Sequence, residues 1–170
     1  MTEGGITLDE LLRSRDERQR LQRQLLAEYP GLTLLVATVI MPGAVKRTRC
    51  TQIAARAIEE EMKRAFSKHI TLHFHHDYPT GYEGWYLVAV SPDCAKRTAC
   101  RIEDGHPLGR MFDIDVIGST GIPISRVSIG LNERKCLLCD HEARYCMRQR
   151  THSLQELQDC IQSLVDHYVR

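Results

Sequence analysis

Two periods of apolar residues recur along this chain, and each predicts a type of element. Leucines at steps of three and four, from Leu8 to Leu26, indicate an amphipathic helix with a polar middle, and Thr7 is placed to cap its start. A continuous apolar run after Pro30 has the length of a buried strand. Taken along the whole chain, the patterns predict helices over 8–28, 51–68, 93–103, 140–149 and 153–169, and strands over 32–40, 70–75, 85–90, 111–117 and 122–127.

The order of these elements predicts an α+β (mixed α/β) fold, with a mixed sheet flanked by helices. A chain of 170 residues fits one domain over 1–170. The last two predicted strands form a hairpin around Gly118 to Gly121, which would bring Arg126 near the preceding strand. The final helix has a capping box, with Ser153 as the cap and Glu156 three residues later.

The strand over 111–117 carries the first candidate chemistry. Side chains alternate along a strand, so Asp113 and Asp115 share one face, and two like charges this close repel unless a cation lies between them. Carboxylates and substrate phosphates are the usual ligands of Mg²⁺. The pair therefore predicts either a magnesium-dependent phosphoryl or nucleotidyl transfer site, with a nucleotidyltransferase-like Asp-x-Asp strand, or a solvated strand face.

Basic residues at strand ends are candidates for binding phosphates. Arg110 precedes the acids on a Pro-Gly loop, and Lys46 and Arg47 lie on the loop after the first strand. Arg126 joins them if the hairpin forms. A solvated loop is the alternative for Lys46 and Arg47, because the loop lacks the order of a phosphate-binding P-loop. The arginines on the first helix are predicted to be a solvated face that also suits a polyphosphate ligand.

The cysteines form a second candidate site. Cys136 and Cys139 have the spacing of half a structural zinc site, which Cys146 with His141 or His152 would complete. The alternative is that Cys146 is a small buried residue of a helix. Three histidines at 73, 75 and 76 lack ligand spacing with a cysteine and are predicted to be ordinary strand and turn residues.

Composition and charge limit the binding partners and the cell compartment that we expect. The net charge of +1 indicates no nucleic-acid or membrane field, and no apolar run approaches the length of a membrane span. The first residues lack the regions of a secretory signal, and seven cysteines do not make a complete set of disulfides. We expect a cytoplasmic protein with reduced thiols.

Several motifs resemble one family. His106-Pro-Leu-Gly-Arg-Met-Phe-Asp-Ile-Asp-Val116, the Pro-Gly-x-x-Lys loop that ends at Lys46 and the Arg-x-Cys-Leu-x-Cys motif that ends at Cys139 are similar to those of citrate lyase holo-acyl carrier protein synthases, the apo-citrate lyase phosphoribosyl-dephospho-CoA transferases. The resemblance spans nearly the whole chain. Residues 47–49 depart from the Asn-Ser associated with this loop.

The resemblance implies an enzyme that moves a 2′-(5″-phosphoribosyl)-3′-dephospho-CoA group from its triphosphate precursor, 2′-(5″-triphosphoribosyl)-3′-dephospho-CoA, to a serine of the apo-acyl carrier protein (gamma) subunit of citrate lyase, with release of pyrophosphate. His106 is then a candidate general base for that serine, with a turn residue as the alternative. Two other functions remain open: the parallel transferase for the malonate decarboxylase carrier, and a non-catalytic zinc-stabilised binding module.

Overall fold

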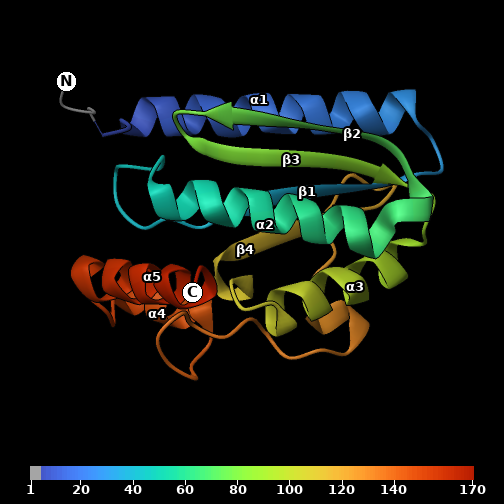
Figure 1. The fold of residues 1–170 in the computed structure, drawn as a ribbon. Helices are drawn as coiled ribbons and strands as arrows, with labels where there is room; N and C mark the ends of the chain where they lie inside the picture. The colour runs from blue at the N-terminus through green and yellow to red at the C-terminus, as the bar shows by residue number, and fades with distance from the viewer. Residues whose placement is uncertain (1–4) are drawn as a thin grey trace.

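The computed structural model describes residues 5–170, and its centre is a four-stranded sheet in the order β2-β3-β1-β4 (Figure 1). The strands are β1 (Thr33–Val39), β2 (Ile70–Tyr78), β3 (Gly81–Val88) and β4 (Phe112–Ile117). All neighbours pair antiparallel, so the predicted α+β class is confirmed but the sheet is not mixed. β1 and β2 run in the same direction, as a helical crossover requires, but β3 lies between them.

Five α-helices surround this sheet in the described chain. They are α1 (Leu8–Glu28), α2 (Arg49–Phe66), α3 (Pro92–Gly105), α4 (Ala143–Gln149) and α5 (Leu154–Tyr168). The predicted caps at Thr7 and Ser153 are confirmed, since each side chain accepts a hydrogen bond from the backbone three residues later. No helix within residues 5–170 has both the length and the apolar character needed to cross a membrane.

The helices bury opposite faces of the sheet. Helix α1 covers one face, whereas α2, α3 and α5 lie on the other side (Figure 1). On the α1 face, Leu25 packs in a cluster with Val36 and Trp85. On the other face, Leu35 and Ile114 belong to the main core, together with side chains from α2, α3 and α5. The polar middle of α1 leaves its N-terminal half without a comparable apolar contact, and polar strand residues lie there instead.

The predicted hairpin after β4 is wrong. Residues 122–127 form no strand; one isolated bridge joins Ile117 to Pro123, and the Ile124 N–H donates to the Val116 carbonyl at 2.8 Å. A proline has no N–H to donate, so it cannot continue a ladder along this edge. Helix α4 also begins at Ala143 rather than near 140, because Glu142 is held in a bridge to Lys135.

Candidate active site at the edge of β4

Asp113 and Asp115 lie on the α1 face of β4. Their strand neighbours Phe112, Ile114 and Val116 are buried in the core of the opposite face, so alternation directs both acids away from that core. The strand register continues the polar surface from Asp113 to Thr38 of β1 and from Thr38 to Glu83 of β3. One end of this sheet face is therefore polar from strand to strand, which explains why the helix above it has a polar middle.

Helix α1 contributes a cation to this surface. Both Nε and Nη2 of Arg18 donate to Glu83 Oε1, at 2.8 and 2.6 Å. The Glu83 side chain is only 4% exposed, so the pair neutralises a carboxylate that would otherwise be buried alone. The charge of Arg18 also acts on Asp115, and the arginines of α1 are therefore not all a solvated face.

The two acids differ in their surroundings. Burial, and next the charge of Asp113, raise the pKa of Asp115 above its ordinary value, against the lowering effect of Lys96. Asp113 is half exposed, and its Oδ1 lies 3.3 Å from Nη1 of Arg134. A partly buried acid next to a second acid is a site where a divalent cation would relieve repulsion, and carboxylate oxygens are ligands that Mg²⁺ prefers.

Helix α3 closes the free edge of β4. The Ile114 N–H donates to Glu103 Oε1 at 2.8 Å, and Lys96 Nζ donates to the Ile114 carbonyl at 3.3 Å. Arg126 binds Glu103 at 2.6 Å and Asp104 at 3.0 Å. Burial opposes the charge on Arg126, but its hydrogen bonds to Asp104 and Glu103 outweigh burial and raise the pKa of its guanidinium. These contacts fix the edge strand and keep Arg126 charged.

These groups border a cavity of about 350 Å³, called here the acid cavity. It brings together three residues singled out from the sequence, Asp113, Asp115 and Arg126. Its walls add cations and acids from α3, from α4 and from the segment between β4 and α4, namely Lys96, Glu103, Glu133, Arg134, Glu142 and Arg144. Carboxylates in a cavity with four surrounding cations suit a metal-bound, phosphate-bearing ligand.

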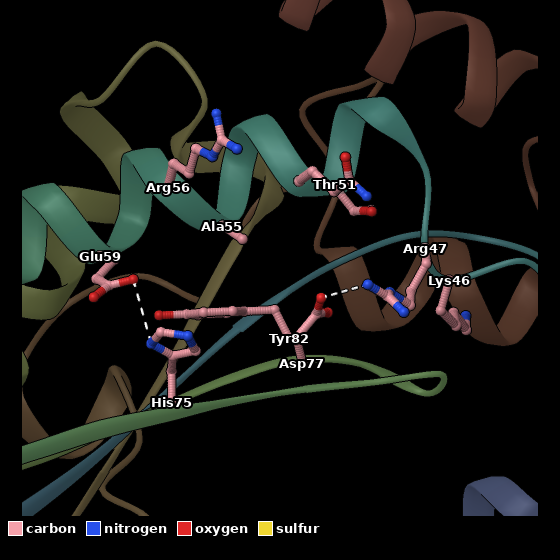
Figure 2. A pocket seen from close by; sticks show the side chains of 10 residues that line it. Lys46, Arg47, Thr51, Ala55, Arg56, Glu59, His75, Asp77 and Tyr82 are labelled. Atoms are coloured by element: carbon pink, nitrogen blue, oxygen red, sulfur yellow. Dashed lines mark hydrogen bonds and ion pairs between the residues drawn. The ribbon is translucent and has the colours of Figure 1, made fainter.

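Lys46 and Arg47 line a different cavity of about 440 Å³, beside the β2–β3 hairpin and α2 (Figure 2). Arg47 faces Asp77 at 2.7 Å, and His75 faces Glu59 at 3.6 Å. Tyr82 extends between these pairs, and its buried hydroxyl has no hydrogen-bond partner among the described residues. The charges of this hairpin cavity are largely compensated from within.

Lys46 and Arg56 are the exceptions among those charges, and the surroundings of Lys46 favour an anion. Arg56 makes no ion pair with a described residue. Lys46 Nζ donates to the Met41 carbonyl at 2.5 Å and makes no ion pair with a described residue. Burial, and next the nearby charge of Arg15, lower the pKa of Lys46. An anion between Lys46 and Arg15 would offset both effects. The loop that carries Lys46 leaves β1 at the same end of the sheet at which β4 begins, because Val39 pairs with Phe112.

His106 and Arg110 line neither cavity. The His106 ring lies 4.9 Å from that of Phe112 and 5.5 Å from that of Tyr168, and its Nδ1 accepts the Leu108 N–H at 3.0 Å. Burial lowers the pKa of His106. Arg110 is exposed and donates to the Cys136 carbonyl at 2.8 Å. The structure therefore does not bring the candidate base to the acids, and it joins Arg110 to the cysteine segment.

Cys136, Cys139, Cys146 and His152 come together, and their ligand atoms all lie within 4.8 Å of one another. The distances are 3.5 Å between the sulfurs of Cys139 and Cys146, and 3.4 Å from His152 Nε2 to Cys139 Sγ. Zinc bonded tetrahedrally at about 2.3 Å to sulfur and about 2.0 Å to nitrogen requires edges of roughly 3.5 to 3.8 Å. The cluster therefore fits a metal ion, and His152 rather than His141 is the fourth member.

Several side chains of the acid cavity could not be identified from any pattern in the sequence. Glu103 lies 11 residues before Ile114, which it binds, and Arg134 lies 21 residues after its partner Asp113. Neither belongs to a motif with regular spacing, and only the packing of α3 and of the cysteine segment against β4 brings them to the acids. In the sequence, nothing distinguishes Lys96 from the other charged residues of a helix.

Fold and site together define a class: a one-domain α+β protein with a pair of strand acids in a cation-lined cavity and a separate Cys/His cluster. The family described as CitX, apo-citrate lyase phosphoribosyl-dephospho-CoA transferase, matches residues 6–168, and the chain belongs to this family.

The names of individual relatives agree with this family. An Escherichia coli (O1:K1 / APEC) protein named "Apo-citrate lyase phosphoribosyl-dephospho-CoA transferase" is 33% identical over 95% of this chain and 90% of its own length. A Vibrio cholerae (M66-2) protein with the same name, prefixed "Probable", is 35% identical over 96% and 94%. "Protein CitXG" of Haemophilus influenzae is 33% identical over 98% of this chain, which spans only 37% of that protein.

Proposed function

We propose that this protein transfers the phosphoribosyl-dephospho-CoA group to a serine of the apo-acyl carrier protein subunit of citrate lyase, in the cytoplasm. The observation that carries the proposal is the pair Asp113 and Asp115, set on one strand face in a cavity with Lys96, Arg126 and Arg134. Membership of the family supplies the substrates, and the names of the relatives support a transferase.

The proposed reaction is a displacement at phosphorus. The serine oxygen forms a bond to the α-phosphorus of the 5″-triphosphate, the bond from that phosphorus to the bridging oxygen breaks, and pyrophosphate leaves. When bound between Asp113 and Asp115, Mg²⁺ would supply neutralisation of phosphate charge. The chain itself orients the donor and surrounds the phosphates with fixed cations.

The cations are assigned by position. Arg134 and Lys96 lie in the acid cavity with the acids, and Arg126 lines it from its pairs with Glu103 and Asp104. Lys46, with Arg47, is proposed to hold a more distant phosphate of the donor, because Lys46 lacks a carboxylate partner in the described chain. Arg110 stays a proposed phosphate ligand from the sequence.

Three residues are candidates for the general base, and their contacts distinguish them. His106 is proposed from the sequence, but its ring packs between Phe112 and Tyr168. Glu133 and Glu142 line the acid cavity and make no ion pair with a described residue, so either carboxylate is a nearer acceptor for the serine proton.

Zinc is the proposed occupant of the Cys/His cluster. Three sulfurs and one imidazole nitrogen form a ligand set typical of closed structural zinc sites, which take no part in the reaction. Burial works against a thiolate at Cys136, but the backbone N–H groups of Leu138 and Cys139, together with the thiols of Cys146 and Cys139, outweigh burial and lower the pKa of Cys136. Such a site would connect α4 and the start of α5 to the segment that carries Arg134.

The test combines purified protein, the triphosphate donor, Mg²⁺ and the apo-carrier subunit. We expect the carrier to gain the mass of one phosphoribosyl-dephospho-CoA group and one pyrophosphate to be released for each carrier labelled. The apo-carrier of malonate decarboxylase serves as the control for carrier choice. Stoichiometric zinc without labelling of either carrier would refute the transferase and support a binding module.

A further inference from the structure

Helix α4 and the residue after it form a basic surface. Arg144, Arg148 and Arg150 are all exposed, and none makes an ion pair with another residue between 5 and 170. No acid occurs from residue 143 to residue 152. The whole chain has a net charge of +1, and subtracting these three charges leaves −2 for the rest. This short segment, called here the α4 face, therefore carries three positive charges and no negative one.

The α4 face also exposes apolar side chains. Met147 is 74% exposed and Tyr145 is 52% exposed, whereas Cys146 between them is buried in the Cys/His cluster. A helix of seven residues is too short to be stable alone, so the cluster and the packing around Cys146 hold it in place. Exposed Met and Tyr surrounded by arginines have the composition of a protein-binding surface rather than of a solvated helix.

The position of α4 connects this surface to the site. Arg144 and Met147 are wall residues of the acid cavity, which also contains Asp113 and Asp115. A macromolecule that covered α4 would therefore place its own surface beside the mouth of that cavity. A protein acceptor has to do this, because its serine must reach the donor phosphate that the proposed function places in this cavity.

We propose that the α4 face is the docking surface for the carrier protein, and that it binds acidic side chains around the acceptor serine. This inference rests on the proposed function, which requires a protein acceptor. Unpaired arginines favour an acidic partner surface by charge complementarity, and Met147 and Tyr145 supply the apolar contact. Opposite charges also guide the carrier to the cavity before contact, an effect that salt weakens.

The experiment reverses one charge that lies outside the cavity. Arg148→Glu is compared with Arg23→Glu, which reverses an exposed, unpaired arginine on the C-terminal half of α1. We measure steady-state labelling with the apo-carrier varied and the donor saturating. For Arg148→Glu we expect the KM for carrier to rise about tenfold, with kcat and the KM for donor unchanged. Arg23→Glu should match the wild type.

A second measurement separates docking from chemistry. Apo-carrier is titrated into each protein without donor, at low and at physiological salt. We expect salt to weaken binding to the wild type more than to Arg148→Glu, because the variant lacks one attracting charge. Wild-type carrier binding in Arg148→Glu would overturn the proposal, as would a rise in the KM for donor alone. If the wild type binds carrier but labels nothing, the proposed function fails while docking stands.

Discussion

At the scale of single residues, the ionisation of Asp115 makes its own contribution to the pH dependence of stability. Burial and Asp113 raise its folded pKa above the ordinary carboxyl value of 3.8. Between the unfolded and the folded pKa the native state holds the extra proton, so the contribution of Asp115 to the free energy of unfolding falls as pH rises through that window. The contribution of Asp115 is complete below the unfolded value and lost above the folded one.

The direction of this pH dependence gives a prediction for Asp115→Asn. Without divalent cations, we expect the variant to melt above the wild type at neutral pH and the difference to shrink in acid, because only the wild type has to ionise a buried carboxyl. Added Mg²⁺ should raise the melting temperature of the wild type but not that of the variant. Calorimetry from pH 4 to 8 measures both effects. A difference that does not change with pH would contradict the role of ionisation.

A second prediction concerns activity. Asp113→Asn and Asp115→Asn should each abolish pyrophosphate release, because each removes a charge that a metal needs. Asp113→Asn should leave stability within about 0.5 kcal/mol, since the half-exposed carboxylate makes a weak pair with Arg134. Thermal melting serves as the control for folding. Near-normal turnover in either variant would end the metal hypothesis.

His106 offers a sharp test of how far sequence alone identifies a catalytic group. Its type and position fit a general base, but its contacts with Phe112 and Tyr168 favour a packing role. We therefore expect His106→Gln to melt at a lower temperature and to keep the wild-type pH profile of kcat. Loss of the rate without loss of stability would restore His106 as the base.

At the scale of elements, the predicted positions follow the strength of the local pattern. Apolar patterns predict α1, α2, β1 and β4 within a few residues, because α1, α2 and β4 each bury one face and β1 is buried on both faces. The first half of β3 is missed. Glu83 and Gly84 weaken its pattern. Glu83 binds Arg18, which is distant in sequence, whereas a side chain at Gly84 would meet the hydroxyl of Tyr82, two residues before it, at 2.7 Å.

The contact between α1 and β3 leads to a prediction at this scale. Arg18→Ala leaves the carboxylate of Glu83 buried without its partner, so we expect a loss of about 3 kcal/mol in the free energy of unfolding. Removing both charges with Arg18→Ala and Glu83→Gln should cost less than the single change. Denaturant unfolding of the two variants checks this order. Equal losses would mean that Glu83 remains well solvated.

The cysteine segment connects two elements through one cluster. If it holds zinc, the metal's binding energy becomes folding energy, and a strong chelator should loosen α4 and the start of α5 first. Hydrogen exchange after chelation would then rise in 134–152, while β1 and β3 stay protected. Elemental analysis of protein prepared without a metal affinity tag gives the content. If the zinc content is below a tenth of an equivalent and the chelator does not change the melting temperature, the thiols are packing residues. Each Cys→Ser change should then lower the free energy of unfolding by about 1–2 kcal/mol.

At the scale of the whole molecule, the fold places residues that are close in the sequence in different sites. Asp113 and Arg110 are three residues apart, but one lies in the acid cavity and the other binds the Cys136 carbonyl. Lys46 and Asp113 are distant in sequence, yet the pairing of β1 with β4 brings their segments to one end of the sheet. Local motifs identified the acids and the cysteines, whereas the arrangement of cations depends on contacts between elements that no periodicity encodes.

This arrangement makes a last prediction about the donor. The donor carries a triphosphate at one end and a diphosphate within its dephospho-CoA part, and the acid cavity of about 350 Å³ is too small for a nucleotide of this size. We expect the donor to extend from Asp113 and Asp115 along the end of the sheet toward Lys46, whose charge has no carboxylate partner in the described chain. Lys46→Ala should then weaken donor binding about tenfold, with unchanged melting temperature. Lys68→Ala, an exposed lysine where β2 begins, is the matched control. Equal donor affinity in the two variants, measured by titration without carrier, would confine the donor to the acid cavity and its immediate rim.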